Sequence, residues 1–382
     1  MNKSVAIIPF VCIIILFYGC SREEIPAPSA STCTADYTDH PDHAAYSDVL
    51  TDYASHSSAP GSVIGVKTDQ SPEWIGAVGF SNLEHKTPMD MCTPFRTGSV
   101  TKMFTAVIIM QLYDDHKIDL YAPLTDVLPE VEGRIPDAGR MTIEQLLNHT
   151  SGLRQPTDDD ISYQLTLINN PGVIGSLDAR ARLEKYIYGK SLMHAPGEDS
   201  YYSNAGYWLL QWIIESITAK SLQQNIEERI VSRLGLEHTY LEKRSDVDVS
   251  RGYNFSGQVL KDVTIWDRAD SDGDPAAGVI STARDLLLFG EALFTGHLVS
   301  DTSLARMKVT TSFPSCGGDC GYGLGIETWY TATNEGYGKN GSSIGVDANL
   351  IYFPDQQTTM VIFSNFGGGN DKSVIDALLS IE

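Results

Sequence analysis

The spacing of apolar residues along this 382-residue chain changes from strand-like to helical and back again. This order constrains the fold more than any other feature of the sequence. Near both ends apolar residues alternate with polar ones, whereas the middle, at about residues 120–270, is mostly helical in pattern. The alternating segments predict strands at residues 62–68, 74–80, 324–330, 346–353 and 359–363. Strands from both ends can join one sheet. We therefore expect an α/β (α+β) fold, with an antiparallel sheet flanked by helices and a mostly helical lobe.

Helical spacing is clearest in six segments, at residues 42–57, 99–117, 142–148, 207–218, 283–293 and 371–379. The fifth segment follows Thr282, and Asp285 stands three positions after that threonine. This spacing predicts a capping box, in which each of the two side chains accepts a hydrogen bond from the other residue's backbone amide.

The first 40 residues predict an exported and anchored chain. Lys3 precedes an apolar stretch at residues 5–18, which is short for a membrane span and ends in Gly19 and Cys20. A small residue followed by cysteine is typical of a lipoprotein cleavage site, although an ordinary cleaved signal is the alternative. We predict a bacterial lipoprotein on the periplasmic face of a membrane or on the cell surface. Its parts are a signal peptide at 1–19, a lipidated tether at 20–40 and a folded domain at 41–382.

The chain has six cysteines, and Cys12 lies in the predicted signal, so four remain if Cys20 carries lipid. An even number in an exported chain indicates two disulfides. Cys316 and Cys320 flank a Gly-Gly-Asp turn, which favours that pair and leaves Cys33 to pair with Cys92. Two thiolates alone cannot complete a tetrahedral metal site, so we predict no metal there.

The acidic character of the chain excludes some functions. Its formal net charge of −22 disfavours nucleic-acid binding, which needs clustered Lys and Arg. Asp270, Asp272 and Asp274 have the spacing of a calcium loop, but Pro275 stands where that loop needs glycine. We therefore expect a solvated acidic loop. His149 could suggest a Ser-His-Asp triad, but a structural histidine in the loop after a helix is expected instead. No metal or organic cofactor is predicted.

Ser99 and Lys102 form the first candidate site. Residues three apart lie on one face of a helix, so the ammonium group would stand beside the hydroxyl. A serine hydroxyl needs a base to become nucleophilic, and burial lowers the pKa of a lysine enough for that task. Gly98 permits a tight entry to the helix, which would leave the Ser99 backbone N–H available to a developing oxyanion.

Two further motifs occur once each in the chain. Tyr202-Ser203-Asn204 supplies a phenol that could relay a proton and an amide that could bind a substrate. Lys339-Asn340-Gly341 is expected in a loop just before a strand. Its lysine could hold a substrate carboxylate, its glycine would allow close approach, and the N–H of Ser342 could be a second oxyanion donor.

The order S-x-x-K, Y-x-N, K-x-G resembles the serine β-lactamase and penicillin-binding protein family. The tyrosine of the second motif makes the chain most similar to class C β-lactamases and D-alanyl-D-alanine carboxypeptidases. Four other stretches carry the resemblance, namely 95–98, 146–153, 277–286 and 321–325. The resemblance implies that Ser99 forms an acyl-enzyme, with Lys102 and Tyr202 handling the proton.

The resemblance leaves the substrate open. A D-alanyl-D-alanine carboxypeptidase-like peptidase is the leading hypothesis. The alternatives are a class C-like β-lactamase, an esterase or acyltransferase, and a non-catalytic penicillin-binding sensor. The expected partner is therefore a small peptide, β-lactam or ester, and the oligomeric state is not predicted. Lys339 favours an anionic substrate end, but Asn340 replaces the usual Thr or Ser, whose hydroxyl helps to hold that end.

Overall fold

The computed structural model describes residues 29, 33–244, 247–312, 321–367 and 373–381. Its centre is a sheet in which nine strands of the described chain pair antiparallel in the order β3-β2-β1-β13-β12-β11-β10-β9-β8. The strands are β1 Gly61–Lys67, β2 Trp74–Asn82, β3 Thr87–Pro88, β8 Thr311–Ser312, β9 Gly321–Tyr322, β10 Glu327–Tyr330, β11 Glu335–Ser342, β12 Asp347–Phe353 and β13 Thr358–Ser364. The predicted antiparallel sheet is therefore confirmed, and strands from both chain ends join it.

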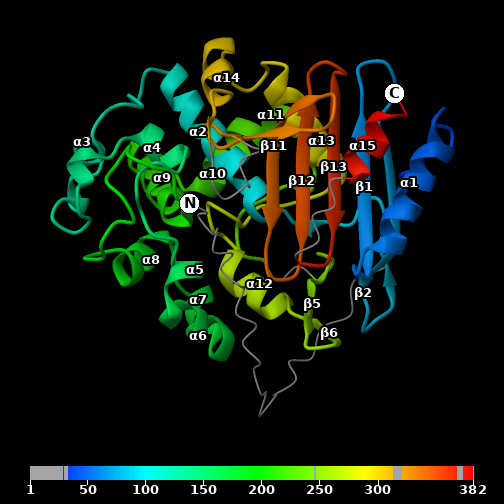
Figure 1. The fold of residues 1–382 in the computed structure, drawn as a ribbon, viewed down its shortest axis with the longest axis horizontal. Helices are drawn as coiled ribbons and strands as arrows, with labels where there is room; N and C mark the ends of the chain where they lie inside the picture. Colours follow the sequence, from blue (N-terminus) through cyan, green and yellow to red (C-terminus); the bar gives the residue numbers. More distant parts are fainter. Residues whose placement is uncertain (1–28, 30–32, 245–246, 313–320, 368–372, 382) are drawn as a thin grey trace, which may run out of the picture.

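Helices cover both faces of this sheet (Figure 1). Side chains of a strand alternate between faces, so Val63 packs with α13 (Ala283–Phe294) while its neighbour Ile64 packs with α1 (His43–His56) and α15 (Ser373–Leu379). Helix α2 (Thr101–Asp114) lies behind α13, where Phe104 and Phe289 stack with ring centroids 3.9 Å apart.

The helical lobe lies beside the sheet, at the left of Figure 1. Its helices are α3 Leu124–Val127, α4 Ile143–Leu147, α5 Pro156–Asp159, α6 Ile161–Asn169, α7 Pro171–Gly175, α8 Ala179–Tyr186, α9 Asn204–Thr218, α10 Leu222–Ile226, α11 Ser232–Leu234 and α12 Thr264–Ser271; α14 spans Asp301–Met307. Short helical turns occupy Gly98–Val100, Pro129–Val131, Ala138–Arg140 and Glu227–Val231. None of the helices within the described ranges combines the length and the hydropathy needed to cross a membrane.

Two local features differ from the sequence expectations. The lobe is mostly helical, as predicted, but it also contains an unpredicted hairpin, β5 (Tyr253–Ser256) with β6 (Val259–Asp262), whose turn begins at Gly257 with φ +66°. The capping box is only half formed. Thr282 accepts from the Asp285 backbone amide, but the Asp285 carboxylate instead accepts from the backbone N–H of His238 at 2.8 Å. That carboxylate thus ties the helix to a loop, not to its own first turn.

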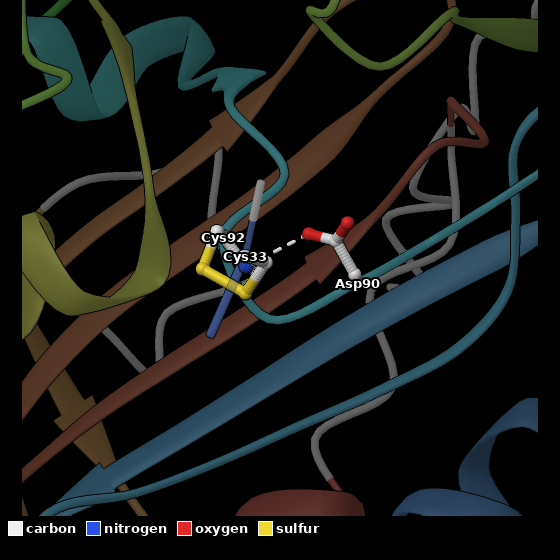
Figure 2. Close-up of side chains that lie close together, drawn as sticks. All are labelled: Cys33, Asp90 and Cys92. Carbon is white, nitrogen blue, oxygen red and sulfur yellow. Dashed lines mark hydrogen bonds between the residues drawn. A yellow bond between two sulfur atoms is a disulfide. The ribbon is translucent and has the colours of Figure 1, made fainter. Parts of the chain in front are cut away.

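Cys33 and Cys92 form the predicted disulfide, with Cα atoms 5.6 Å apart (Figure 2). Asp90 Oδ1 accepts from the Cys92 backbone N–H at 3.0 Å. In the described part of the chain these three side chains are the one acidic or thiol cluster tight enough for a metal ion, but disulfide sulfurs are not thiolate ligands. The bridge fixes Cys33 to the loop that precedes β4 (Phe95–Arg96), which pairs with β7 (Ile280–Ser281). The predicted signal, Cys20, Cys316 and Cys320 lie outside the described residues.

Candidate active site

Ser99 lies in a helical turn, Gly98–Val100, that leads from β4 into α2. Hydrogen bonds to residue 279 fix this turn. The Thr97 backbone N–H donates to the Val279 carbonyl at 3.0 Å, and the Val279 N–H donates to Thr101 Oγ1 at 2.9 Å. Gly98 adopts φ +50°, a left-handed conformation that favours glycine. The hydroxyl therefore stands at the start of a helix, as its sequence predicts.

Lys102 lies one helical turn later and is fully buried. Its Nζ is 3.1 Å from Ser99 Oγ, 2.8 Å from Asn204 Oδ1 and 3.0 Å from the carbonyl oxygen of Ala276. Burial, and then the positive charge of Lys339, hold the pKa of Lys102 well below its ordinary value. A neutral amine can donate to Asn204 and Ala276 while its lone pair faces the serine hydroxyl. This geometry suits a general base.

Tyr202 stands on the other side of the nucleophile. Its Oη lies 2.7 Å from Ser99 Oγ. Burial raises the pKa of Tyr202 well above its ordinary value, so the phenol keeps its proton and can donate it. The His149 ring packs 4.3 Å from the Tyr202 ring, centroid to centroid, and His149 Nδ1 accepts from the Ser203 backbone N–H. His149 has the structural place that the sequence predicts, because it supports the reactive phenol.

Asn204 is the first residue of α9, the helix that carries the second motif into the lobe. Its backbone N–H donates to Gln155 Oε1 at 2.7 Å, and its Oδ1 accepts from Lys102. A substrate contact through Oδ1 would compete with that lysine. The arrangement assigns Asn204 first to the orientation of Lys102.

The third motif lies within β11, not in a loop before a strand as the sequence analysis expects. Lys339 is buried, and its Nζ lies 2.5 Å from Glu327 Oε1 and 2.8 Å from the Asn340 carbonyl oxygen. Successive side chains of a strand point to opposite faces. The Asn340 amide accordingly donates to Asn349 of β12 at 3.0 Å. The structure thus brings Lys339 to the site but directs the Asn340 side chain to its neighbour strand.

Gly341 makes the closest backbone contact between the sheet and the serine turn. A Cβ atom at this position would lie 2.0 Å from the Thr97 carbonyl oxygen and 3.0 Å from the Ser99 backbone nitrogen. Only glycine fits there without displacing backbone. The Ser99 backbone nitrogen lies beside Gly341, and the Ser342 backbone nitrogen lies 3.2 Å from the place of a Cβ atom on Gly98. The two amides that the sequence suggests as oxyanion donors therefore belong to the same contact between sheet and turn.

Comparison with known proteins identifies the family of the chain. A family model described as Beta-lactamase matches residues 47–381. The chain belongs to the β-lactamase family. This β-lactamase-family hydrolase is 25% identical over 346 residues to Penicillin-binding protein 4 of Amycolatopsis lactamdurans, a match that covers 85% of this chain and 86% of that protein. It is also 26% identical over 314 residues to the D-aminopeptidase of Cereibacter sphaeroides. This match covers 80% of this chain but only 57% of that protein.

Solved structures show the same fold. The D-stereospecific amidohydrolase from Streptomyces sp. superposes with a TM-score of 0.76 at 26% identity, over 88% of this chain and 98% of that chain. The penicillin-binding protein from Bacillus halodurans superposes with a TM-score of 0.73 at 22% identity, over 88% of this chain and 98% of that chain. The β-lactamase-family membership and fold that the three motifs predict are therefore confirmed.

Two groups that contact the motif lysines of this β-lactamase-family hydrolase are not among the residues predicted from the sequence. Glu327, on β10, pairs with Lys339, and the Ala276 carbonyl holds Lys102. Glu327 stands in the sequence two residues after the stretch 321–325 that carries the family resemblance, but its partner is visible only once β10 and β11 pair. A backbone carbonyl leaves no signal in a sequence.

The segment with Asp270, Asp272 and Asp274 begins in the last turn of α12 and is not the solvated loop that its sequence predicts. Asp272 pairs with Arg96 and Asp274 with Arg182, at 3.1 Å in both cases. Asp270 Oδ1 accepts from Tyr163 Oη at 2.5 Å. These carboxylates face protein cations and a phenol, and the loop places the Ala276 carbonyl against Lys102.

Proposed function

We propose that the protein hydrolyses the amide bonds of small D-amino-acid peptides or amides through an acyl-enzyme on Ser99. The observation that carries this proposal is the position of Ser99 Oγ between Lys102 Nζ at 3.1 Å and Tyr202 Oη at 2.7 Å. A base and a proton donor on either side of one hydroxyl are what acyl transfer from an amide requires.

The chemistry follows from those contacts. Ser99 Oγ attacks the carbonyl carbon while its proton passes to Lys102 Nζ. The negative charge that develops on the carbonyl oxygen is stabilised by the N–H groups of Ser99 and Ser342. Tyr202 gives its proton to the departing amine and recovers one from Lys102. Water then attacks the ester on Ser99 and gives up a proton to the same relay. The bond between the acyl carbon and Ser99 Oγ breaks, the acid is released, and the relay returns the proton to Ser99 Oγ.

The D configuration of the substrate is supported by the relatives. The proteins named D-aminopeptidase and D-stereospecific amidohydrolase are 26% identical to this chain, and the latter superposes along most of its length. A peptide that ends in D-alanine, the substrate expected from the sequence, is the second candidate. The presence of Lys339 within the site is the observation on its side, since an unpaired cation can bind a terminal carboxylate, but Glu327 Oε1 already pairs with this lysine.

A panel of substrates tests the proposal. Purified protein would be offered D-alanine amide, D-phenylalanine amide, their L enantiomers, an acylated D-alanyl-D-alanine peptide, nitrocefin and a p-nitrophenyl ester. Hydrolysis of the D amides, lost in Ser99→Ala, is the expected result. Turnover of nitrocefin alone, or of esters alone, would replace the proposal with a β-lactamase or an esterase. Equal rates for D and L amides would contradict the stereochemical part.

We also propose that the mature chain starts at a lipid-modified Cys20 and is held at a membrane surface. The support is the apolar stretch at residues 5–18, which is followed directly by Gly19 and Cys20. In a bacterial host that processes lipoproteins, wild-type protein should partition into Triton X-114, while Cys20→Ser should stay in the aqueous phase. Mass spectrometry of the N-terminal peptide would identify the modification. An unmodified Cys20 would overturn this proposal.

A further inference from the structure

Glu327 is the acidic side chain that contacts the lysine of the third motif. Its Oε1 lies 2.5 Å from Lys339 Nζ, and its Oε2 accepts from the Asn340 backbone N–H at 3.2 Å. Both charges are largely removed from solvent, since the Lys339 side chain is 3% exposed and the Glu327 side chain 15%. The carboxylate is therefore fixed at two points on the strand that forms one wall of the site.

The remaining surroundings of Lys339 complete its enclosure. The carbonyl oxygen of Asn340 accepts a second hydrogen bond from Nζ at 2.8 Å, and the rings of Tyr202 and Tyr322 have their centroids 5.5 Å away. An ammonium group paired in this way presents little net positive charge to a ligand, because the attraction it exerts on an anion is cancelled by the adjacent carboxylate. A substrate carboxylate would also have to compete with Glu327 for the same N–H groups.

We propose that Glu327 is a specificity-determining residue that neutralises Lys339, so that the site favours acyl donors without a carboxylate beside the scissile bond. The preferred donors would be amides and peptides whose leaving end is uncharged. This inference deepens the proposed function and rests on it for the nature of the natural substrate. It concerns the charge of the substrate, which can be varied independently of its stereochemistry.

A matched pair of β-lactams measures the effect of a carboxylate on the substrate. Benzylpenicillin carries a carboxylate and its methyl ester does not, while their reactive rings are the same. Mass spectrometry would measure the rate at which each forms an adduct on Ser99, so deacylation is not required. We expect the wild-type protein to react faster with the ester. In Glu327→Gln the ratio of carboxylate to ester rates should rise by about tenfold or more, because Lys339 becomes an unpaired cation.

Two variants separate charge from structure. Glu335→Gln removes one negative charge from the same hairpin, but Glu335 is exposed and its carboxylate accepts from Tyr337 Oη at 2.6 Å. This variant should keep the wild-type ratio. The double variant with Glu327→Gln and Lys339→Met is again neutral at the site, and its ratio should return toward that of the wild type.

The outcomes are distinct. An unchanged ratio in Glu327→Gln, or a lack of any Ser99 adduct with either β-lactam in that variant, overturns the role of Glu327. If Glu327→Gln does not fold, the double variant and Lys339→Met test the role of Glu327 instead. The inference requires that their ratio of carboxylate to ester rates is no higher than that of the wild type. Failure of the D-amide panel with a normal shift in the penicillin ratio would reject the proposed function and leave this inference intact.

Discussion

Arg182 and Asp274 form an ion pair directly behind the site, with Nη1 and Oδ2 3.1 Å apart and side chains only 3% and 4% exposed. The second oxygen of Asp274 accepts from the Ala276 backbone N–H at 2.8 Å, and the Ala276 carbonyl in turn accepts from Lys102. The pair therefore holds the segment that positions Lys102.

Asp274→Asn should accordingly lower both stability and reactivity. It leaves the Arg182 charge buried without its carboxylate, which costs about 3 kcal/mol of the free energy of unfolding. Urea unfolding would measure the loss, and the rate of fluorophosphonate labelling of Ser99 would measure the effect on the site. Glu228→Gln is the control, because the Lys220–Glu228 pair is about half exposed and its loss should change stability by less than about 1 kcal/mol. Equal effects of the two substitutions would contradict the prediction.

The charge of Lys339 should set the pH at which Ser99 becomes reactive. Neutral Lys102 is the reactive form, so the labelling rate rises with pH as Lys102 loses its proton. After burial, the charge of Lys339 is the next cause that lowers the pKa of Lys102. Lys339→Met removes that charge, so the pKa of Lys102 should rise. The acid limb of the plot of labelling rate against pH should then move to higher pH. Lys308→Met, which removes a cation beside the Phe294 ring, should leave the limb in place. A shift to lower pH would disprove the assignment.

Tyr202→Phe should slow the hydrolysis of an amide much more than the hydrolysis of an ester with a good leaving group. An amine must be protonated as it departs, and removal of a positioned acid costs about 10²–10⁴-fold in rate. A p-nitrophenolate leaves without a proton, so the loss for its ester should be much smaller. Parallel kcat/KM measurements on a D-amide and an ester would test this difference. The adjacent Tyr201→Phe removes a phenol that donates to Asp159 at 2.6 Å and should not separate the two substrates.

His149 should make stability depend on pH. Burial, and then the charges of Lys102 and Lys339, hold the pKa of His149 well below its ordinary value of 6.5. Below pH 6.5 the unfolded chain therefore binds a proton that the folded chain does not, so stability should fall as the pH drops from 6.5. The slope due to this one group approaches about 1.4 kcal/mol per pH unit.

Urea unfolding at several pH values would measure that slope. His149→Gln should flatten it below pH 6.5. The exposed His56 provides the control, since His56→Gln should keep the wild-type slope. A slope that is unchanged in His149→Gln would assign the pH dependence to other groups.

How much the sequence predicts depends on how local each contact is. Ser99 and Lys102 meet because helical spacing brings them together, so their proximity needs no tertiary information. Strand β11 was not predicted, because Gly336, Gly338 and Gly341 give it a weak strand propensity and its pairing with β10 and β12 supplies the order. The pair between Glu327 and Lys339 follows from that pairing and was missed with it.

Polar residues outside the motifs were harder to place. Acidic composition, with a spacing that fits no complete metal loop, predicts Asp270, Asp272 and Asp274 in solvent. Arg96, which pairs with Asp272, and Arg182, which pairs with Asp274, lie far away in the sequence. The sequence alone therefore does not show that these carboxylates are buried against cations. The sequence thus predicts the motif residues. Their partners come from distant segments of the chain and are found only in the folded structure.

The pairing of β1 with β13 bears on how the chain is made. Ser62 stands opposite Ser364, so one of the first strands to be synthesised completes its hydrogen bonds only with one of the last. Until β13 emerges, β1 has one open edge, and β11 and β12, although already synthesised, have no strand that joins them to β1. Contacts so distant in sequence form slowly. An unfinished or C-terminally truncated chain would therefore hold the nucleophile without the sheet that makes it reactive, and full reactivity would arrive only when the whole chain has been released.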